Sequence, residues 1–235
     1  MLFAMFVAYR LGRLLTTDHT STAFANAQDL WHVERWLRLP RETGVQDWFL
    51  QSTHAIELAN TYYAVVHFPA TVGFLIWMFL RRPAHYLWIR RSIVILSASA
   101  LIVHVLYPLA PPRMRPDLGF IDTGAVYGPD VYGPPEGASI ANQFAAMPSL
   151  HIGWAVLIAV GLIATTRSKW RWLWLGHPIL TVLVVVGTAN HWWLDGVVAL
   201  VLLAGAMALA AVPERWTINR LLRGERRTPS RPDPT

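Results

Sequence analysis

The chain has 235 residues, of which 54% are hydrophobic and only 14% are charged, and it contains twelve Trp and no Cys. Soluble domains carry about 25% charged residues, so this composition is typical of a protein that lies within a lipid bilayer. The lack of Cys excludes a disulfide scaffold and zinc or redox chemistry based on thiolates. The net charge of +6 comes from basic residues clustered between apolar segments, which indicates loops flanking a membrane and not a nucleic-acid-binding surface.

The first two predicted elements are a short apolar segment and an amphipathic helix. Residues 1–15 are apolar with two Arg, and we expect them to form part of a transmembrane span rather than a cleaved signal peptide. Residues 24–39 place Leu30, Trp31 and Leu37 near one side of a helix. This pattern predicts a short helix that lies along the membrane interface.

Five longer apolar runs follow, and each approaches the roughly 20 residues that a helix needs to cross the hydrocarbon core. They cover residues 62–80, 92–110, 149–166, 173–189 and 194–212. The segment 111–147 is rich in Gly and Pro and predicts an irregular outer loop. We therefore predict an all-α polytopic membrane protein with six transmembrane helices, a short interfacial helix and a Gly/Pro-rich outer loop. Residues 1–212 form its membrane domain, and we expect the basic tail, residues 213–235, to be disordered.

The distribution of charge between the runs predicts the orientation. Basic residues gather in segments 81–91 and 167–171 and in the C-terminal tail, whereas segments 17–58 and 111–147 hold most of the acidic residues. The positive-inside rule then places the basic connections and both termini in the cytoplasm. The two acidic segments are expected to face the extracytoplasmic side.

A small group of ionisable residues is predicted to meet at that outer face. His151 begins the run 149–166, and His191 lies 40 residues later, which is about the length of two crossings and a short turn. Asp195 follows one helical turn after His191, within reach of its imidazole. Arg113 closes an earlier span on the same face. Because ionisable groups in a membrane are costly, their convergence indicates an active site.

These residue types suit phosphoryl transfer. A histidine oriented by a carboxylate can act as a nucleophile or base, and a second histidine can protonate the leaving group. The guanidinium of an Arg matches the geometry of a phosphate. Together they provide phosphoryl-transfer chemistry that requires no metal and no other cofactor.

Three segments resemble signatures of the type 2 phosphatidic acid phosphatase superfamily. They are AMPSLH at residues 146–151, NHWWLD at residues 190–195 and YPLAPPR at residues 107–113. The PSLH and HxxxD forms are most similar to the branch that contains fungal inositol phosphorylceramide synthase and its bacterial homologues. The resemblance extends over about residues 60–196.

The resemblance implies a role for each matched residue. His191 is the nucleophile that forms a phosphohistidine, Asp195 orients and charges it, and His151 protonates the leaving group. Ser149 is expected to contact phosphate oxygens.

The first signature departs from the family pattern. Typical members have a Lys seven residues before an Arg-Pro pair, but here Arg115-Pro116 places Pro108 at that position. Arg113, Arg115 or both must therefore bind phosphate. This difference favours the transferase-like branch over a broad-range phosphatase.

The leading hypothesis is a lipid phosphatase or phosphotransferase that takes a lipid phosphate or phosphodiester from the bilayer at the outer face. One alternative is a proton-coupled transporter that uses the same cluster, although such carriers usually place their acids near the midplane. Another is metal-assisted hydrolysis with His104 added to the His/Asp ligands, which leaves Arg113 unexplained. Otherwise His104 and His67, both within spans, are expected to be structural histidines that form hydrogen bonds, and the alternative is that they line a site.

Overall fold

The computed structural model describes residues 20–131 and 143–211. This part of the chain is helical, with a single bridge pair between Leu109 and Ala145 as its only extended pairing. The predicted first span, residues 1–15, and the predicted tail, residues 213–235, lie outside the described residues.

All five longer apolar runs form helices, which confirms these parts of the prediction. The helices are α5 (His67–Arg81), α6 (Pro83–Leu106), α8 (Leu150–Thr165), α9 (Gly176–Gly187) and α10 (Trp193–Ala210). The run that contains α5 starts earlier than expected, because α4 (Thr53–Thr61), the π-helical turn η1 (Tyr62–Val66) and α5 form one continuous helix.

Four helices in the described part of the chain are long and apolar enough to cross a membrane. They are Thr53–Arg81, Pro83–Leu106, Lys169–Gly187 and Trp193–Ala210. The third of these consists of the 3-10 helix η4 (Lys169–Leu175) followed by α9. Helix α8 is also apolar but is shorter. Large apolar side chains project from these helices, and Phe68, Ile102 and Val201 are each at least 60% exposed. Such exposure is costly in water and favourable in lipid, so the structure is consistent with an integral membrane protein.

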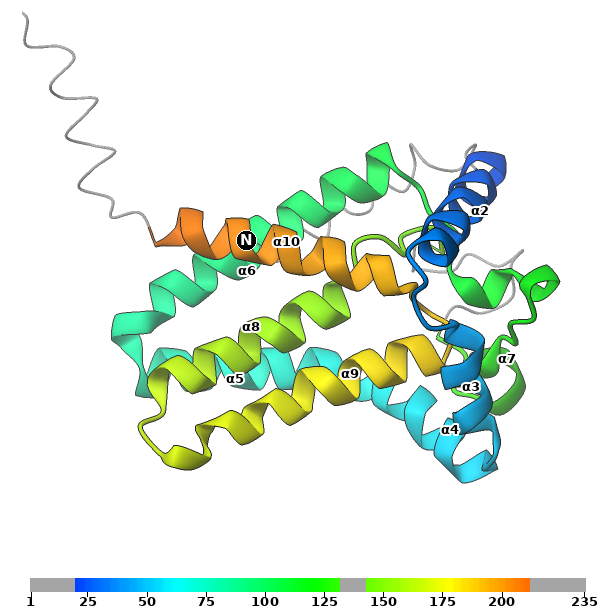
Figure 1. Cartoon of the computed structure of the whole chain (residues 1–235). Coiled ribbons are helices and arrows are strands. Elements are labelled where there is room, and N and C mark those ends of the chain that lie inside the picture. Colours follow the sequence, from blue (N-terminus) through cyan, green and yellow to red (C-terminus); the bar gives the residue numbers. More distant parts are fainter. Residues whose placement is uncertain (1–19, 132–142, 212–235) are drawn as a thin grey trace, which may run out of the picture.

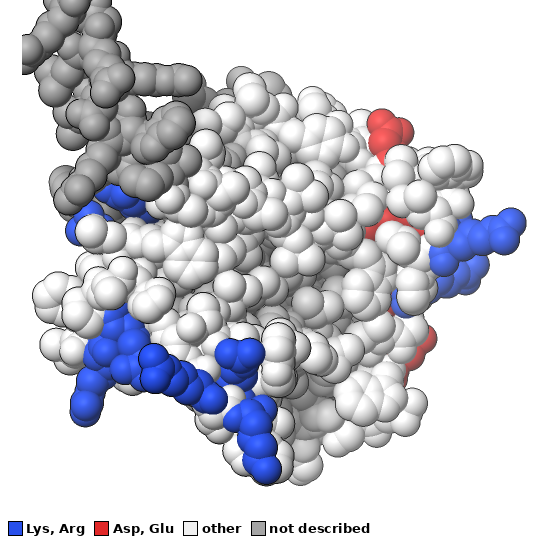
Figure 2. Space-filling model, turned by 60° about the vertical axis from the view of Figure 1, so that its left-hand side comes forward, with Lys and Arg blue, Asp and Glu red and all other residues white. Residues whose placement is uncertain are grey.

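The five helices lie side by side and give the molecule two distinct ends (Figure 1). One end, called here the site end, carries α2 (Thr20–Trp36), α3 (Glu42–Leu50) and α7 (Thr123–Tyr127). The other, called here the basic end, carries the α5–α6 connection and η4, with Arg81, Arg82, Lys169 and Arg171. Figure 2 shows Lys and Arg side chains gathered near that end.

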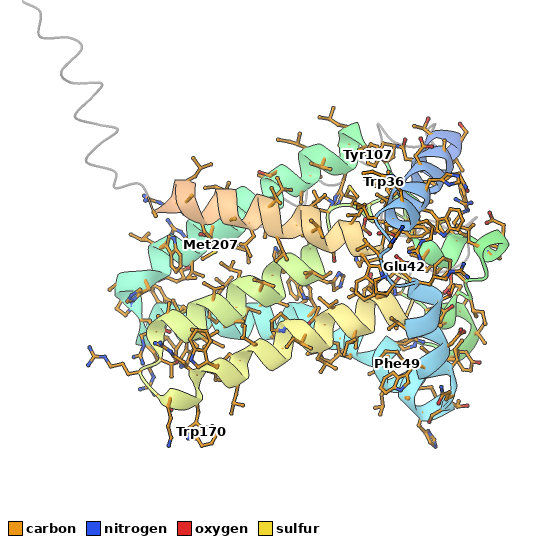
Figure 3. The ribbon with its side chains drawn as sticks, viewed as in Figure 1. Trp36, Glu42, Phe49, Tyr107, Trp170 and Met207 are labelled. Carbon is orange, nitrogen blue, oxygen red and sulfur yellow. The ribbon has the colours of Figure 1, made fainter. Side chains whose placement is uncertain are left out.

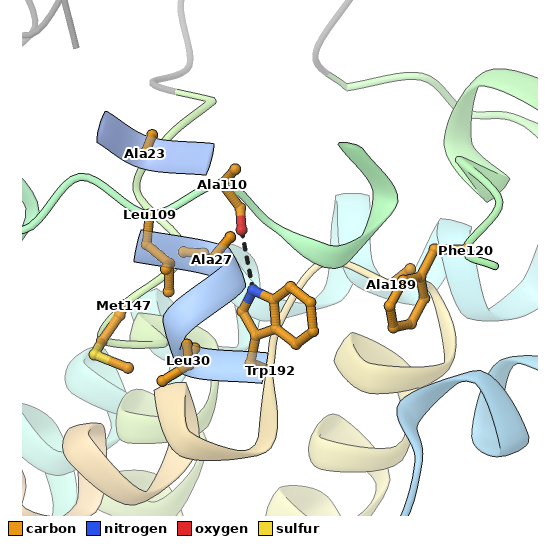
Figure 4. Close-up of a cluster of buried hydrophobic side chains, with 10 residues drawn as sticks. Ala23, Ala27, Leu30, Leu109, Ala110, Phe120, Met147, Ala189 and Trp192 are labelled. Atoms are coloured by element: carbon orange, nitrogen blue, oxygen red, sulfur yellow. Dashed lines mark hydrogen bonds between the residues drawn. The ribbon is translucent and has the colours of Figure 1, made fainter. Parts of the chain in front are cut away.

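Helix α2 corresponds to the predicted interfacial helix and lies across the site end (Figure 1). Its buried residues follow helical spacing: Ala23, Ala27, Leu30 and Glu34. The apolar members of this face pack against Trp192, whose indole N–H donates to the carbonyl oxygen of Ala110 at 3.0 Å (Figure 4). Helix α2 therefore packs directly on the NHWWLD segment.

Helix α3 was not expected from the sequence. It buries Phe49 beside the last residue of α9, Gly187, where any side chain would meet the Phe49 ring. Within the predicted irregular segment 111–147, the described residues form the 3-10 turns η2 (Pro112–Met114) and η3 (Pro116–Leu118) and the short helix α7.

Asn60 binds the part of this segment around Thr123 and Gly128. Its side-chain amide donates to the carbonyl oxygens of Thr123 and Gly128 at 2.8 and 3.0 Å, and its carbonyl oxygen accepts from the Thr123 hydroxyl. The segment is therefore held onto α4 at the site end.

Candidate active site

The His191–Asp195 pair is formed by the turn that leads into α10. Asp195 lies in the first turn of this helix and is fully buried. Its Oδ2 accepts from the backbone N–H of Trp192 at 2.9 Å and lies 3.2 Å from His191 Nδ1. The carboxylate thus caps the helix and fixes the imidazole at the same time. The predicted contact between the two residues is present.

The tautomer of His191 follows from its neighbours. Besides Asp195, Nδ1 lies 2.9 Å from the carbonyl oxygen of Ala146. Both neighbours are acceptors, so Nδ1 carries the hydrogen and Nε2 keeps its lone pair. Burial lowers the pKa of His191 to about 4, and the Arg113 guanidinium acts in the same direction, whereas the hydrogen bond to Ala146 opposes it. A neutral imidazole with a free Nε2 lone pair has the form required of a nucleophile.

The structure brings His151 to His191, with ring centroids 5.7 Å apart. His151 lies in the first turn of α8, which Ser149 caps by accepting from the backbone N–H of Ile152 at 3.4 Å. The backbone N–H of Ser149 donates to the carbonyl oxygen of Asp195 at 3.1 Å. The PSLH and HxxxD segments are therefore joined directly through their backbones.

Two aromatic side chains of the long helix enclose His151. Tyr63 stacks on its ring at a centroid distance of 4.4 Å, and His67 lies at 4.3 Å and stacks in turn on Trp154. Tyr63 belongs to the π-helical turn η1, a local widening of the helix that is frequent at functional sites. The sequence analysis missed Tyr63, and for His67 it favoured a structural role over a place in the lining of a site. The sequence feature that could have indicated Tyr63 is its position four residues before His67, a histidine within a predicted span.

The two candidate phosphate-binding arginines have different surroundings. Arg113 is buried, its backbone N–H donates to the carbonyl oxygen of Ala189, and its Nε lies 3.6 Å from Asp122 Oδ2. A small hollow at the site end has a lining that includes Arg113, Tyr63 and Asn190. Arg113 therefore lies near His191, because its backbone partner Ala189 is two residues before that histidine and its charge acts on the pKa of His191.

Arg115 instead binds Asp117. Its Nε and Nη2 donate to the carboxylate at 2.9 and 2.7 Å, and Nη2 also donates to Gln28. These hydrogen bonds lower the pKa of Asp117. Because this carboxylate and an amide oxygen already engage the guanidinium, Arg115 is the weaker candidate for phosphate.

The structure gives His104 a local partner, with Nε2 3.2 Å from the carbonyl oxygen of Pro148. This contact agrees with the expected structural role. Within residues 20–131 and 143–211, no group of three or more His, Asp or Glu side chains is arranged to hold a metal ion. The ligand set suggested for metal-assisted hydrolysis is therefore not assembled there.

The sequence analysis also missed the contribution of the α2–α3 segment. Glu34, on the buried face of α2, accepts from the backbone N–H of Leu194 at 2.9 Å. The sequence feature that could have indicated this role is that Glu34 continues the helical spacing of the apolar residues Ala23, Ala27 and Leu30.

A family model described as the PAP2 superfamily matches residues 28–209, a range that runs from α2 to the end of α10 and includes every site residue named above. The search of curated proteins and the search of solved structures gave no match. The chain belongs to the PAP2 superfamily.

Proposed function

We propose that this protein is a membrane phosphatase or phosphotransferase in which a lipid phosphate or phosphodiester reacts with His191. The observation that carries the proposal is the geometry of His191: Nδ1 is held between Asp195 and the Ala146 carbonyl, and the ring lies beside His151. Membership in the PAP2 superfamily supports the same class of reaction.

In the first step, His191 Nε2 attacks phosphorus and the bond from phosphorus to the leaving oxygen breaks. Protonated His151 gives its proton to that oxygen, and the phosphoryl group remains on His191 as a phosphohistidine. Asp195 stabilises the positive charge that develops on the imidazole ring. Arg113 binds the non-bridging oxygens of the phosphoryl group, and the Ser149 hydroxyl donates to one of them.

In the second step, neutral His151 takes a proton from a water molecule or an alcohol, whose oxygen attacks phosphorus. The bond from phosphorus to His191 Nε2 breaks and both histidines return to their starting states. A phosphate monoester substrate gives inorganic phosphate with water and a new phosphomonoester with an alcohol such as inositol. A phosphodiester substrate gives a phosphomonoester with water and a new phosphodiester with an alcohol. The absence of the family's Lys, replaced by Pro108, supports the transferase-like outcome.

A lipid substrate is supported by an apolar groove of about 430 Å³ between α5 and α6. Its lining includes Phe68, Ser97 and Trp154, and Trp154 is one helical turn from His151. An acyl chain in this groove would leave its phosphate near the histidines. We place the site end on the extracytoplasmic side, because the basic end lies opposite and basic loops remain in the cytoplasm.

The test is to incubate the purified protein with phosphate-labelled lipid phosphates, with and without inositol, and to trap the enzyme by rapid denaturation. We expect a labelled protein adduct that is stable in alkali and labile in acid, together with free phosphate or, when an acceptor alcohol is present, the labelled phosphate ester of that alcohol. His191→Ala should abolish both the adduct and turnover. His177→Ala is the matched control, because His177 contacts Tyr62 on α4–η1 and lies apart from the pair.

The role of His151 is tested separately. General acid catalysis contributes about 10²- to 10⁴-fold, so His151→Ala should slow turnover by that factor with poor leaving groups and by less with good ones. If His191→Ala still forms the adduct while His151→Ala does not, the two roles are reversed. If no lipid phosphate yields an adduct or a product, the proposed function is wrong, and a transport assay of the same protein becomes the next step.

A further inference from the structure

Two buried carboxyl groups face each other beneath the start of α10. Glu34 on α2 is 0% exposed and Glu42 on α3 is 1% exposed, and both lie beside Arg35, whose Nη2 is 3.8 Å from Glu34 Oε2 and 3.2 Å from Glu42 Oε2. Figure 3 shows Glu42 where α2, α3 and the first turn of α10 meet. Two buried negative charges beside a single guanidinium repel each other, so we expect one of the two carboxyl groups to carry a proton.

The surrounding bonds locate that proton. Glu34 Oε1 accepts from the backbone N–H of Leu194 at 2.9 Å, and Glu42 Oε2 accepts from Arg35 Nη2 at 3.2 Å. Among the described residues, the remaining oxygens, Glu34 Oε2 and Glu42 Oε1, have no hydrogen-bond partner. A single proton between these two oxygens satisfies both and leaves one negative charge opposite Arg35.

The electrostatic surroundings agree with a proton on Glu34. Burial raises the pKa of Glu34 to about 9, with further upward contributions from Glu42 and Asp195, while the bond from Leu194 acts in the opposite direction. The charged groups that face Glu34 are thus Arg35 on its own helix, Glu42 on α3 and Asp195 on α10. At neutral pH Glu34 is protonated.

The segment from α2 to α3 also contacts the residues between His191 and Asp195. The Trp193 indole N–H donates to the carbonyl oxygen of Pro40, in the α2–α3 connection, at 2.8 Å. Leu194 is held by Glu34, and Trp192 packs against the buried face of α2. Every residue between the nucleophile and its carboxylate is therefore fixed by α2, by α3 or by the connection between them.

We propose that Glu34 is a positioning residue, which, while protonated and bound to Glu42, holds the first turn of α10 so that Asp195 and His191 keep their reactive geometry. This inference rests on the proposed function for its effect on catalysis. Loss of the proton would place negative charges on Glu34, Glu42 and Asp195 close to the Arg35 guanidinium, and their mutual repulsion would loosen the turn. The enzyme would then lose activity as the pH rises.

The test compares Glu34→Gln and Glu34→Ala with Glu57→Gln, a control at an exposed Glu of α4. Gln keeps an acceptor for Leu194 and a donor for Glu42, whereas Ala removes both. We expect Glu34→Ala to lower kcat about ten- to a hundredfold with little change in KM, as expected for a misplaced catalytic group. Glu34→Gln should match the wild type at pH 7 and keep its kcat at alkaline pH, whereas the kcat of the wild type falls to about half near pH 9.

Two measurements that require no substrate separate this inference from the proposed function. Hydrogen–deuterium exchange of the peptide 190–199 should rise in Glu34→Ala but not in Glu34→Gln. The melting temperature of the wild type should fall relative to that of Glu34→Gln as the pH rises from about 4.5 to about 9, because only the folded wild type retains the proton in that range.

These outcomes decide the inference in either case. The inference would be overturned, even in an active enzyme, if Glu34→Ala and Glu34→Gln showed equal hydrogen–deuterium exchange. It would also be overturned if the melting temperatures of the wild type and Glu34→Gln changed by the same amount as the pH rises. An unchanged kcat in Glu34→Ala would overturn the positioning role. A protein that shows the expected exchange and melting behaviour but converts no lipid phosphate would retain the carboxyl pair and refute only the proposed function.

Discussion

Replacement of Asp195 by Asn isolates the charge of the carboxylate from its geometry. Asp195 Oδ2 accepts from Trp192 N–H at 2.9 Å and lies 3.2 Å from His191 Nδ1. The amide oxygen of Asn can occupy the same position and keep both bonds, so we expect the fold and the cap of α10 to survive. The amide cannot balance the positive charge that His191 acquires when it is phosphorylated.

The size of the loss can be bounded from this geometry. A hydrogen bond to a charged group contributes about 1 kcal/mol more than a neutral one, which sets the lower limit. Two unit charges 3.2 Å apart interact by about 5 kcal/mol at an effective dielectric constant of about 20, which sets the upper limit. Asp195→Asn should therefore lower kcat by between about fivefold and several thousandfold.

The assay is steady-state turnover of a labelled lipid phosphate together with trapping of the phosphohistidine and a melting curve. We expect a lower kcat, a slower appearance of the adduct, and a KM and melting temperature close to those of the wild type. A variant whose kcat stays within twofold of the wild type would show that the charge of Asp195 is not used. A large drop in melting temperature would instead assign Asp195 a mainly structural role.

Three further predictions concern packing, orientation and metal dependence. Gly187→Ala should destabilise the protein by about 1–3 kcal/mol, measured by denaturation, because its methyl group would meet Phe49, whereas Gly205→Ala, with nothing within 4 Å, should not. A Cys at Gly128 should react with an impermeant thiol reagent added outside intact cells and a Cys at Arg82 should not, and the reverse pattern would refute the proposed orientation. Turnover should persist in a chelator and be inhibited by vanadate; loss in chelator with recovery on adding zinc would favour metal-assisted hydrolysis.

The local features of the site were predictable from the sequence. The contact between His191 and Asp195 forms where the chain enters α10: Asp195, in the first turn, reaches back past the N-cap residue Trp192 to His191, so it depends mainly on a local spacing of four residues. The Ser149 cap of α8 has the same local origin. The choice between Arg113 and Arg115 depends instead on the path of a Pro-rich segment, which residue spacing does not define.

The sequence by itself determined the apolar helices and the meeting of the two histidine motifs. A helix must reach about 20 apolar residues to cross the hydrocarbon core, so run length and loop length fix which residues share a depth. Tertiary structure alone decided which side chains surround them. Tyr63 reaches His151 through a π-helical turn, and Glu34 reaches Leu194 across 160 residues. Such contacts depend on how helices that are distant in the sequence pack together, so the hydrophobic periodicity of a single segment cannot predict them.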